Sequence, residues 1–352
     1  MSATCLALMS VFNTAEPGTI TPQDCMGIGA EMAGRFSNIQ PDPGIPNQFS
    51  IPIARLDIGL DFQGMGTRVR TSAVRSASQG SYIGVDGESI LMRLDLAEVR
   101  WIETDWGLGI TAGLVQDAWS STENSAWDFR ALALSLGQQN NWMDGSDTGG
   151  TVVWTSRNNL VTIAAQMTSG EGSKARERNN GINTAGLITI RAPTPDDMNL
   201  EITGFARDGS KGQLLARNHR FGGRINGAWK SLDAGASHLK ALGVNGLILP
   251  EPSGTSAWFT INSPQKVLGA ARVDMTNWNG EDATSTALTL AVGTSLPVRA
   301  KGDAPGALMV GWKRHANSDN ASGVAGAQIF EEANTLFLQL QFRGQKTVGF
   351  DQ

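Results

Sequence analysis

The fold is decided by the stretch Arg55-Leu56-Asp57-Ile58-Gly59-Leu60-Asp61-Phe62-Gln63. Its even positions are apolar, and its odd positions are charged, polar or glycine. A period of two is the period of a β-strand, whose side chains point alternately to opposite faces. A helix is disfavoured because glycine and β-branched residues interrupt nearly every window of this kind. The stretch therefore predicts a strand with one apolar and one charged face.

The same alternation recurs along the chain, for example in residues 220–230, 271–276 and 336–343. Many of the expected strands reach the roughly 9–11 residues that a tilted membrane strand needs. We expect sixteen, with fourteen or eighteen as alternatives, at residues 26–36, 51–63, 66–78, 90–102, 106–117, 149–156, 159–168, 185–192, 199–207, 219–230, 234–243, 255–262, 266–276, 286–296, 306–315 and 334–343.

Composition narrows the class of protein. Only 17% of the 352 residues are charged, 42 are glycine, 2 are cysteine, and the net charge is -5. These values exclude a disordered chain and a disulfide scaffold, and they argue against a nucleic-acid binder. No apolar run is long enough for a membrane helix, and no nucleotide-binding, zinc or hydrolase motif occurs. A soluble β protein and a transmembrane β-barrel are left.

Connection lengths favour the barrel. Short turn signals near residues 156–159, 193–197, 230–233, 262–265 and 296–305 are separated by longer polar stretches. Short turns at one end and long loops at the other are typical of outer-membrane barrels. Residues 118–148 are expected to be one long connection that folds into the barrel, with a short helix near Ala131–Leu136. Reading residues 126–137 as another strand would make the strand count odd.

Charges on the polar strand faces are the best evidence for deciding between a soluble β protein and a transmembrane barrel. Burying so many charges in a soluble core would be prohibitively costly, whereas a barrel of 16–18 strands encloses water. Acids on the long connection would then oppose the wall arginines, or they are solvated loop residues. The expected pore-lining and constriction residues are Arg55, Asp57, Asp61, Arg68, Arg70, Arg93, Asp95, Glu123, Asp128, Arg130, Arg220, Arg224, Arg272 and Asp274.

Tryptophans near the expected strand ends predict an aromatic girdle at the membrane surfaces, where such rings favour the interface. The alternative is packing beneath the loops of a soluble fold. The girdle residues are expected to be Trp101, Trp106, Trp119, Trp229, Trp258, Trp278 and Trp312.

We expect three regions: an N-terminal periplasmic segment or signal remnant at 1–24, the barrel at 25–343 and a tail at 344–352. Residues 6–12 are apolar like a signal-peptide core, but no basic residue precedes them. Cys5 and Cys25 form a disulfide in an oxidising compartment, or else act as small apolar residues.

Three segments carry a resemblance to a known family: residues 91–101, residues 107–119, which precede the long connection, and residues 333–342 near the C-terminus. They resemble the Gram-negative trimeric porins of the general, phosphate-selective and dicarboxylate types. The resemblance implies an outer-membrane homotrimer in contact with lipid and lipopolysaccharide. It also implies passive diffusion of small solutes and ions, with no cofactor, no metal, no catalytic residue and no nucleic-acid partner.

Other hypotheses stay open. A structural or docking barrel of a larger envelope assembly is the main alternative, and a soluble sandwich or solenoid adhesin is another. An outer-membrane hydrolase would need His219, His238 or His315 beside a nucleophile, but no nucleophile motif accompanies them. Basic residues in the loop 170–183 either contact lipopolysaccharide phosphates or a neighbouring subunit, or form a solvated tip.

Overall fold

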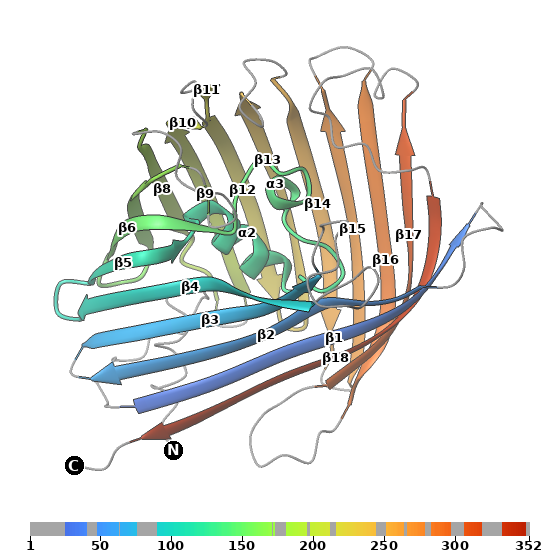
Figure 1. Ribbon diagram of the computed structural model, residues 1–352, viewed down its shortest axis with the longest axis horizontal. Helices are drawn as coiled ribbons and strands as arrows, with labels where there is room; N and C mark the ends of the chain where they lie inside the picture. The colour runs from blue at the N-terminus through green and yellow to red at the C-terminus, as the bar shows by residue number, and fades with distance from the viewer. Residues whose placement is uncertain are drawn as a thin grey trace, which may run out of the picture.

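The computed structural model describes residues 25–40, 48–62, 64–75, 90–170, 172, 181–195, 198–211, 216–243, 251–263, 266–278, 283–296, 306–318 and 333–349. They form a closed antiparallel barrel of sixteen strands (Figure 1). Each strand pairs with its neighbour in the chain, and β1 closes the ring against β18. The alternation of polar and apolar residues therefore predicted both the strands and their number.

The strands correspond one to one with those expected from the sequence. Their bounds are β1 Cys25–Gln40, β2 Gln48–Phe62, β3 Met65–Arg75, β4 Ile90–Glu103, β5 Leu108–Gln116, β6 Ser146–Thr155, β7 Val161–Thr168, β8 Asn183–Arg191, β9 Met198–Asp208, β12 His219–Trp229, β13 Leu232–Leu242, β14 Ser253–Asn262, β15 Val267–Asn277, β16 Thr284–Leu296, β17 Gly306–Asn317 and β18 Ala333–Gly349. A small hairpin, β10 (Ser210–Lys211) with β11 (Ala216–Arg217), was not expected, because strands of two residues carry no periodic signal.

The closing seam corrects the expected C-terminal boundary. Strand β18 continues to Gly349, and its register with β1 runs from Cys25 opposite Gly349 to Gln40 opposite Asn334. Residues 344–349, expected to be a tail, therefore belong to the barrel. Their sequence does not alternate, so only the partner strand, which takes up their backbone hydrogen bonds, reveals them as a strand. The expected segment 1–24 lies outside the described residues.

Connection lengths are segregated as predicted. Short turns such as Thr104–Gly107 and Lys230–Ser231 lie at the end of the barrel where β1 begins and β18 finishes. Gly107 has a φ of +65°, and a Cβ there would lie 2.1 Å from the carbonyl oxygen of Thr155. Only glycine fits this tight crossing between two neighbouring turns. Most of the longer connections join strand ends at the opposite end, and residues 297–305, between β16 and β17, are the exception.

The two faces of the wall differ in chemistry. Large apolar side chains such as Leu56, Ile58, Leu60 and Phe62 are exposed on the outside. Arg55, Asp57 and Asp61 occupy the alternate positions of the same strand and point inward. No helix in the described residues is long and apolar enough to cross a membrane.

The connection between β5 and β6 lies inside the barrel, as predicted (Figure 1). We call residues 117–145 the inner loop. It contains α2 (Ala118–Trp127) and α3 (Leu136–Gln139). The expected helix near Ala131–Leu136 is wrong. The main helix forms earlier because the Asp117 side chain accepts a hydrogen bond from the backbone nitrogen of Ser120, which caps the helix at its N-terminus.

Candidate functional site

The inner loop is fixed to one side of the barrel by two apolar clusters. In the first, Trp119, Leu136 and Trp142 are fully buried against the inner faces of β6–β9 and β13 and against Trp278. Trp119 stacks on Phe205 with ring centroids 5.3 Å apart, and Trp142 meets Trp278 edge-on at 5.6 Å. Buried aromatic pairs of this kind supply a large part of the packing energy.

The second cluster lies nearer the seam. Trp127 and Leu132 of the inner loop pack against apolar residues that point inward from the wall, namely Trp258, Leu268, Ala270, Met309 and Phe337. The Trp127 indole nitrogen donates to the carbonyl oxygen of Ala133, 3.0 Å away, which satisfies its only donor. The inner loop thus has a hydrophobic core that is shared with the wall.

Inward-facing glycines make room for the inner loop. A Cβ at Gly254 would lie 2.7 Å from Leu136 Cδ2 and 3.2 Å from the Trp142 ring. A Cβ at Gly222 would lie 3.1 Å from the Trp119 ring. The glycines that are unusually frequent in the sequence therefore include wall positions where the loop approaches the strand backbone closely.

Polar contacts complete the attachment. Arg207 Nη1 lies 3.2 Å from Asp117 Oδ2, and the Ser237 hydroxyl donates to Glu123 Oε1 at 2.7 Å. Arg220 Nε donates to the carbonyl oxygen of Trp142 at 2.7 Å. Burial raises the pKa of Asp117 despite Arg207, and it raises the pKa of Glu123 despite Arg272. The contact between loop and wall is therefore sensitive to protonation.

This attachment corrects part of the expected pore lining. Several of the predicted residues do point inward, but the inner loop covers them, so that the Arg272 side chain is only 1% exposed. The predicted residues that are sealed between loop and wall are Glu123, Arg220, Arg224, Arg272 and Asp274. Alternation reveals which face a side chain is on, but not what packs over it.

The opposite side, formed by β1–β4, carries the more accessible of the predicted charges, although Asp61 and Arg70 are also buried there, at 7% and 8% exposure. Arg93 is 36% exposed and bonds Asp95 at 2.7 Å, and Arg68 lies 3.1 Å from Asp57. The other ion pairs on this inner surface are Arg55–Glu31 at 2.5 Å, Arg70–Asp57 at 2.8 Å and Arg100–Asp61 at 2.6 Å. The prediction that Arg55, Asp57, Asp61, Arg68, Arg70, Arg93 and Asp95 point inward agrees with these positions.

Sequence reasoning missed Glu31, Glu98 and Arg100 as members of this surface. Glu31 forms ion pairs with two arginines, Arg55 and Arg343, and the pair with Arg343 has a distance of 3.2 Å. The alternation of β1 would have revealed it, because Met32 and Phe36 are exposed outside while Glu31 and Ala33 are buried inside.

The free edge of the inner loop presents Asp128 and Arg130. The Asp128 side chain is 67% exposed and lies 3.4 Å from Arg343 of β18. Burial lowers the pKa of Arg130, and the nearby charge of Arg70 lowers it further. The carboxylates of Glu31 and Asp95 act in the opposite direction, so Arg130 lies near wall charges of both signs. Of the three predicted loop charges, Asp128 lies beside a wall arginine, Arg130 lies near charges of both signs, and Glu123 is sealed against the wall.

The predicted girdle tryptophans also divide into exposed and buried residues. Trp101, Trp106 and Trp229 are exposed on the outside or at a turn, with Trp106 75% exposed. Trp312 pairs with the outward-facing Leu290 and Leu336, so it shares their face. The girdle assignment is wrong for Trp119, Trp258 and Trp278, which are buried inside. Proximity to a strand end did not distinguish the two faces.

The remaining predicted groups are the cysteines, the basic residues of loop 170–183 and the histidines. Cys5 is outside the described residues, as are the basic residues of loop 170–183, Lys174, Arg176 and Arg178. His219 Nδ1 is 2.5 Å from Asp208 Oδ1, and in the described residues no serine hydroxyl is hydrogen-bonded to this pair. Within the same residues no group of three His, Cys, Asp or Glu side chains could hold a metal ion.

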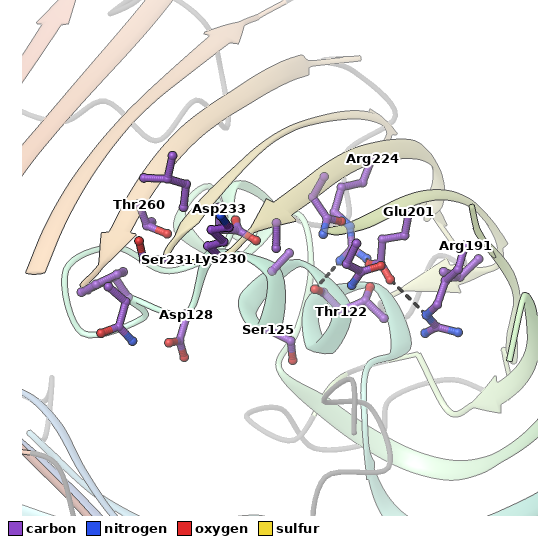
Figure 2. A pocket seen from close by; sticks show the side chains of 18 residues that line it. Thr122, Ser125, Asp128, Arg191, Glu201, Arg224, Lys230, Ser231, Asp233 and Thr260 are labelled. Atoms are coloured by element: carbon purple, nitrogen blue, oxygen red, sulfur yellow. Dashed lines mark hydrogen bonds and ion pairs between the residues drawn. The ribbon is translucent and has the colours of Figure 1, made fainter. Parts of the chain in front are cut away.

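A cavity of about 440 Å³ lies between α2 and the inner faces of β8, β9 and β12–β14 (Figure 2). Hydroxyl, amide and charged side chains dominate its lining. It opens on the half of the barrel nearer the short turns, because Lys230 and Ser231 of one such turn belong to its rim.

Comparison with known proteins supports the fold. No family model and no curated protein sequence matches the chain. Among solved structures, the anion-selective porin from Comamonas acidovorans superposes with a TM-score of 0.61 at 10% identity, covering 92% of this chain and 98% of that one. The trimer form of OmpT, an outer membrane protein of Vibrio cholerae, gives 0.58 at 11% identity, with 90% and 98% covered. OprB of Pseudomonas putida gives 0.53 at 10%, with 91% of each chain covered. The chain thus has the closed β-barrel fold of these outer-membrane proteins.

Proposed function

We propose that the protein is an outer-membrane channel for the passive diffusion of small hydrophilic solutes and ions. The observation that carries this proposal is the partly exposed, charged inner surface of β1–β4 inside a barrel whose outer surface is apolar. An apolar outer face suits lipid, and strands closed into a ring leave no unpaired edge. An ionised, partly exposed inner face requires water.

The inner loop sets the width of the passage. It is attached to the side formed by β6–β9 and β12–β18, and Arg35 of β1 also donates to the carbonyl oxygen of Ala131 at 2.5 Å. The passage therefore runs along β2–β4. Solute size is limited by the distance between the edge at Asp128 and Arg130 and the opposite wall. The charges on these two surfaces would then set ion preference, as rings of charge do in other channels. Neither catalysis nor a cofactor is needed.

Two finer features of the proposal draw on proteins of similar fold. One of the similar structures is a trimer form, and another is an anion-selective porin. A homotrimer in the outer membrane, surrounded by lipid and lipopolysaccharide and girdled by Trp101, Trp106, Trp229 and Trp312, is the assembly that we propose. Arginine-rich charge on the inner surface favours a mild preference for anions.

Conductance of the purified full chain in planar bilayers tests the function. We expect large, stable steps in KCl, and steps in groups of three would support the trimer. Deleting residues 124–144 should raise the single-channel conductance, because it removes most of the inner loop. Well-folded protein that never conducts would contradict the channel and favour a docking barrel with a closed pore.

A further inference from the structure

The cavity beneath α2 has two ends of opposite charge, and both are labelled in Figure 2. At one end Glu201 is shared by two arginines, Arg191 and Arg224. At the other end Asp128 of the inner loop and Asp233 of β13 face the same space. The first end has more cationic groups than anionic ones, and the second has more carboxylates.

The arginine end is built to receive an anion. Arg224 is held in place by Glu201, by the carbonyl oxygen of Thr122 on the inner loop, and by Thr203 at 3.2 Å. Arg191 is more accessible, and its Nε lies 3.4 Å from Glu201 Oε2, while its Nη1 donates to the carbonyl oxygen of Asn159 and to Thr162 Oγ1. Its Nη2 is left to donate a charge-assisted hydrogen bond to a carboxylate.

The carboxylate end is built to receive a cation. Asp233 Oδ1 accepts from the Trp258 indole nitrogen at 3.2 Å, which fixes the side chain without neutralising it. The nearby Lys230 has its Nζ 5.2 Å from the ring centroid of Trp229, so this cation interacts with an aromatic ring of the outer face. Asp128 shares Arg343 with Glu31 and stays largely exposed.

Between the two ends the lining is neutral and polar. Asn226 is only 8% exposed, and its Oδ1 atom has no hydrogen-bond partner among the described residues. A buried amide oxygen without a partner is costly unless a ligand or water supplies a donor.

Strand geometry sets the separation of the charged ends. Arg191 on β8 and Asp233 on β13 are three strand spacings apart, since β9 and β12 lie between them. At about 4.8 Å per spacing, their backbones are about 14 Å apart across the sheet. Charges placed this far apart on the wall suit a solute with separated charges better than an α-amino acid, whose charges are adjacent.

We propose that this cavity binds a zwitterionic solute of dipeptide length during its passage, with its carboxylate at Arg191 and its ammonium group between Asp128 and Asp233. The proposal rests on the proposed channel function and names a solute class for it. A solute with separated charges matches both ends, whereas an ion of a single sign is repelled by one of them.

Glycylglycine is the probe, added to planar bilayers that contain the full-length protein in KCl. We expect transient, concentration-dependent current blockage, and a half-blocking concentration raised at least tenfold by Arg191→Gln and by Asp233→Asn. Asp128→Asn should weaken blockage as well, and asparagine tolerates the left-handed backbone conformation that Asp128 adopts at the end of α2. The matched controls are Arg157→Gln and Asp105→Asn, which make the same changes in exposed short turns outside the cavity and should leave blockage unchanged.

Two results would overturn the zwitterion site while leaving the channel intact. One is blockage by acetate, ethylammonium or glucose as strong as that by glycylglycine, with glucose blockage indicating a polyol site. The other is blockage that survives all three cavity substitutions. If the protein does not conduct in KCl, the channel proposal fails, and calorimetry of glycylglycine with the folded protein in detergent then decides the cavity proposal alone. Heat absorbed or released by the wild type but not by Asp128→Asn supports the site, and equal heats refute it.

Discussion

The guanidinium carbon of Arg272, on the inner wall, lies 5.2 Å from the centroid of the Trp127 ring, on the inner loop. Stacking of this kind covers the arginine with an aromatic surface and attaches the loop to the wall. A residue that alternation assigns to a water-filled lumen is thereby removed from it. Because this contact fixes the inner loop to the wall, it also fixes the loop edge that limits the width of the passage.

Replacing this ring should release the inner loop. Trp127→Ala removes an almost fully buried side chain from the second cluster, and such truncations cost about 3–5 kcal/mol. We expect a larger and noisier single-channel conductance, because the loop edge leaves its position and Arg272 becomes accessible. Trp106→Ala, at an exposed turn, is the control and should conduct like the wild type. Equal conductance of the two variants would contradict the role of Trp127.

Conductance should depend on pH through Glu123 and Asp117. Burial raises the pKa of both carboxyls above their usual values of 4.5 and 3.8, so the attached loop holds these protons more tightly than a released one. Attachment is therefore most stable at acidic pH and weakens as pH rises through the raised values. We expect conductance to increase as pH rises above the ordinary pKa range of carboxyl groups.

Glu123→Gln provides the check on that sign. The amide cannot ionise and can still accept from Ser237, so the pH dependence should become smaller. Asp128→Asn, which changes an exposed carboxyl of the same loop, should retain it. A wild-type conductance that falls with pH would refute the assignment.

Ion preference should depend on Arg130. Arg130→Glu reverses the charge at the loop edge, which lies near wall charges of both signs. A unit charge about 4 Å away in water changes an interaction by about 1 kcal/mol, or roughly fivefold in local ion concentration. Reversal potentials in a KCl gradient should shift towards cations, and the shift should shrink at about 1 M salt because of screening. Arg157→Glu, in an exposed turn, should shift them little, and equal shifts would contradict the prediction.

The pairing of β18 with β1 predicts that residues 344–349 are needed for the barrel to form. Truncation after Arg343 removes residues opposite Cys25–Ala30 and leaves that part of β1 without a partner at the seam. Because unpaired strand edges are not tolerated in lipid, this variant should fail to form a heat-modifiable barrel on gels. Truncation after Gly349 keeps every pair and should fold. Normal folding of the shorter chain would show that the last six residues of β18 are dispensable.

Alternation in the sequence was sufficient to predict sixteen strands, their inward and outward faces, and one long connection that enters the barrel. These features depend on local chemistry, since residues two apart on a strand share a face whatever surrounds them. The same reasoning placed Arg55 and Asp57 inside and Leu56 and Ile58 outside. It failed for residues 344–349, where no alternation marks the strand and only pairing with β1 identifies it.

The sequence by itself thus determined the barrel and the polarity of its two surfaces, because the side-chain period of a strand is a local property. Only the tertiary structure decided which inner charges reach water. Arg272 and Arg93 have equivalent inward positions, yet the first is covered by Trp127 and the second is accessible. The difference arises because Trp119, Trp127 and Trp142 fix the inner loop to the side of the barrel that holds Arg272. The side that holds Arg93 is left uncovered. The cavity beneath α2 likewise exists only because the inner loop packs there.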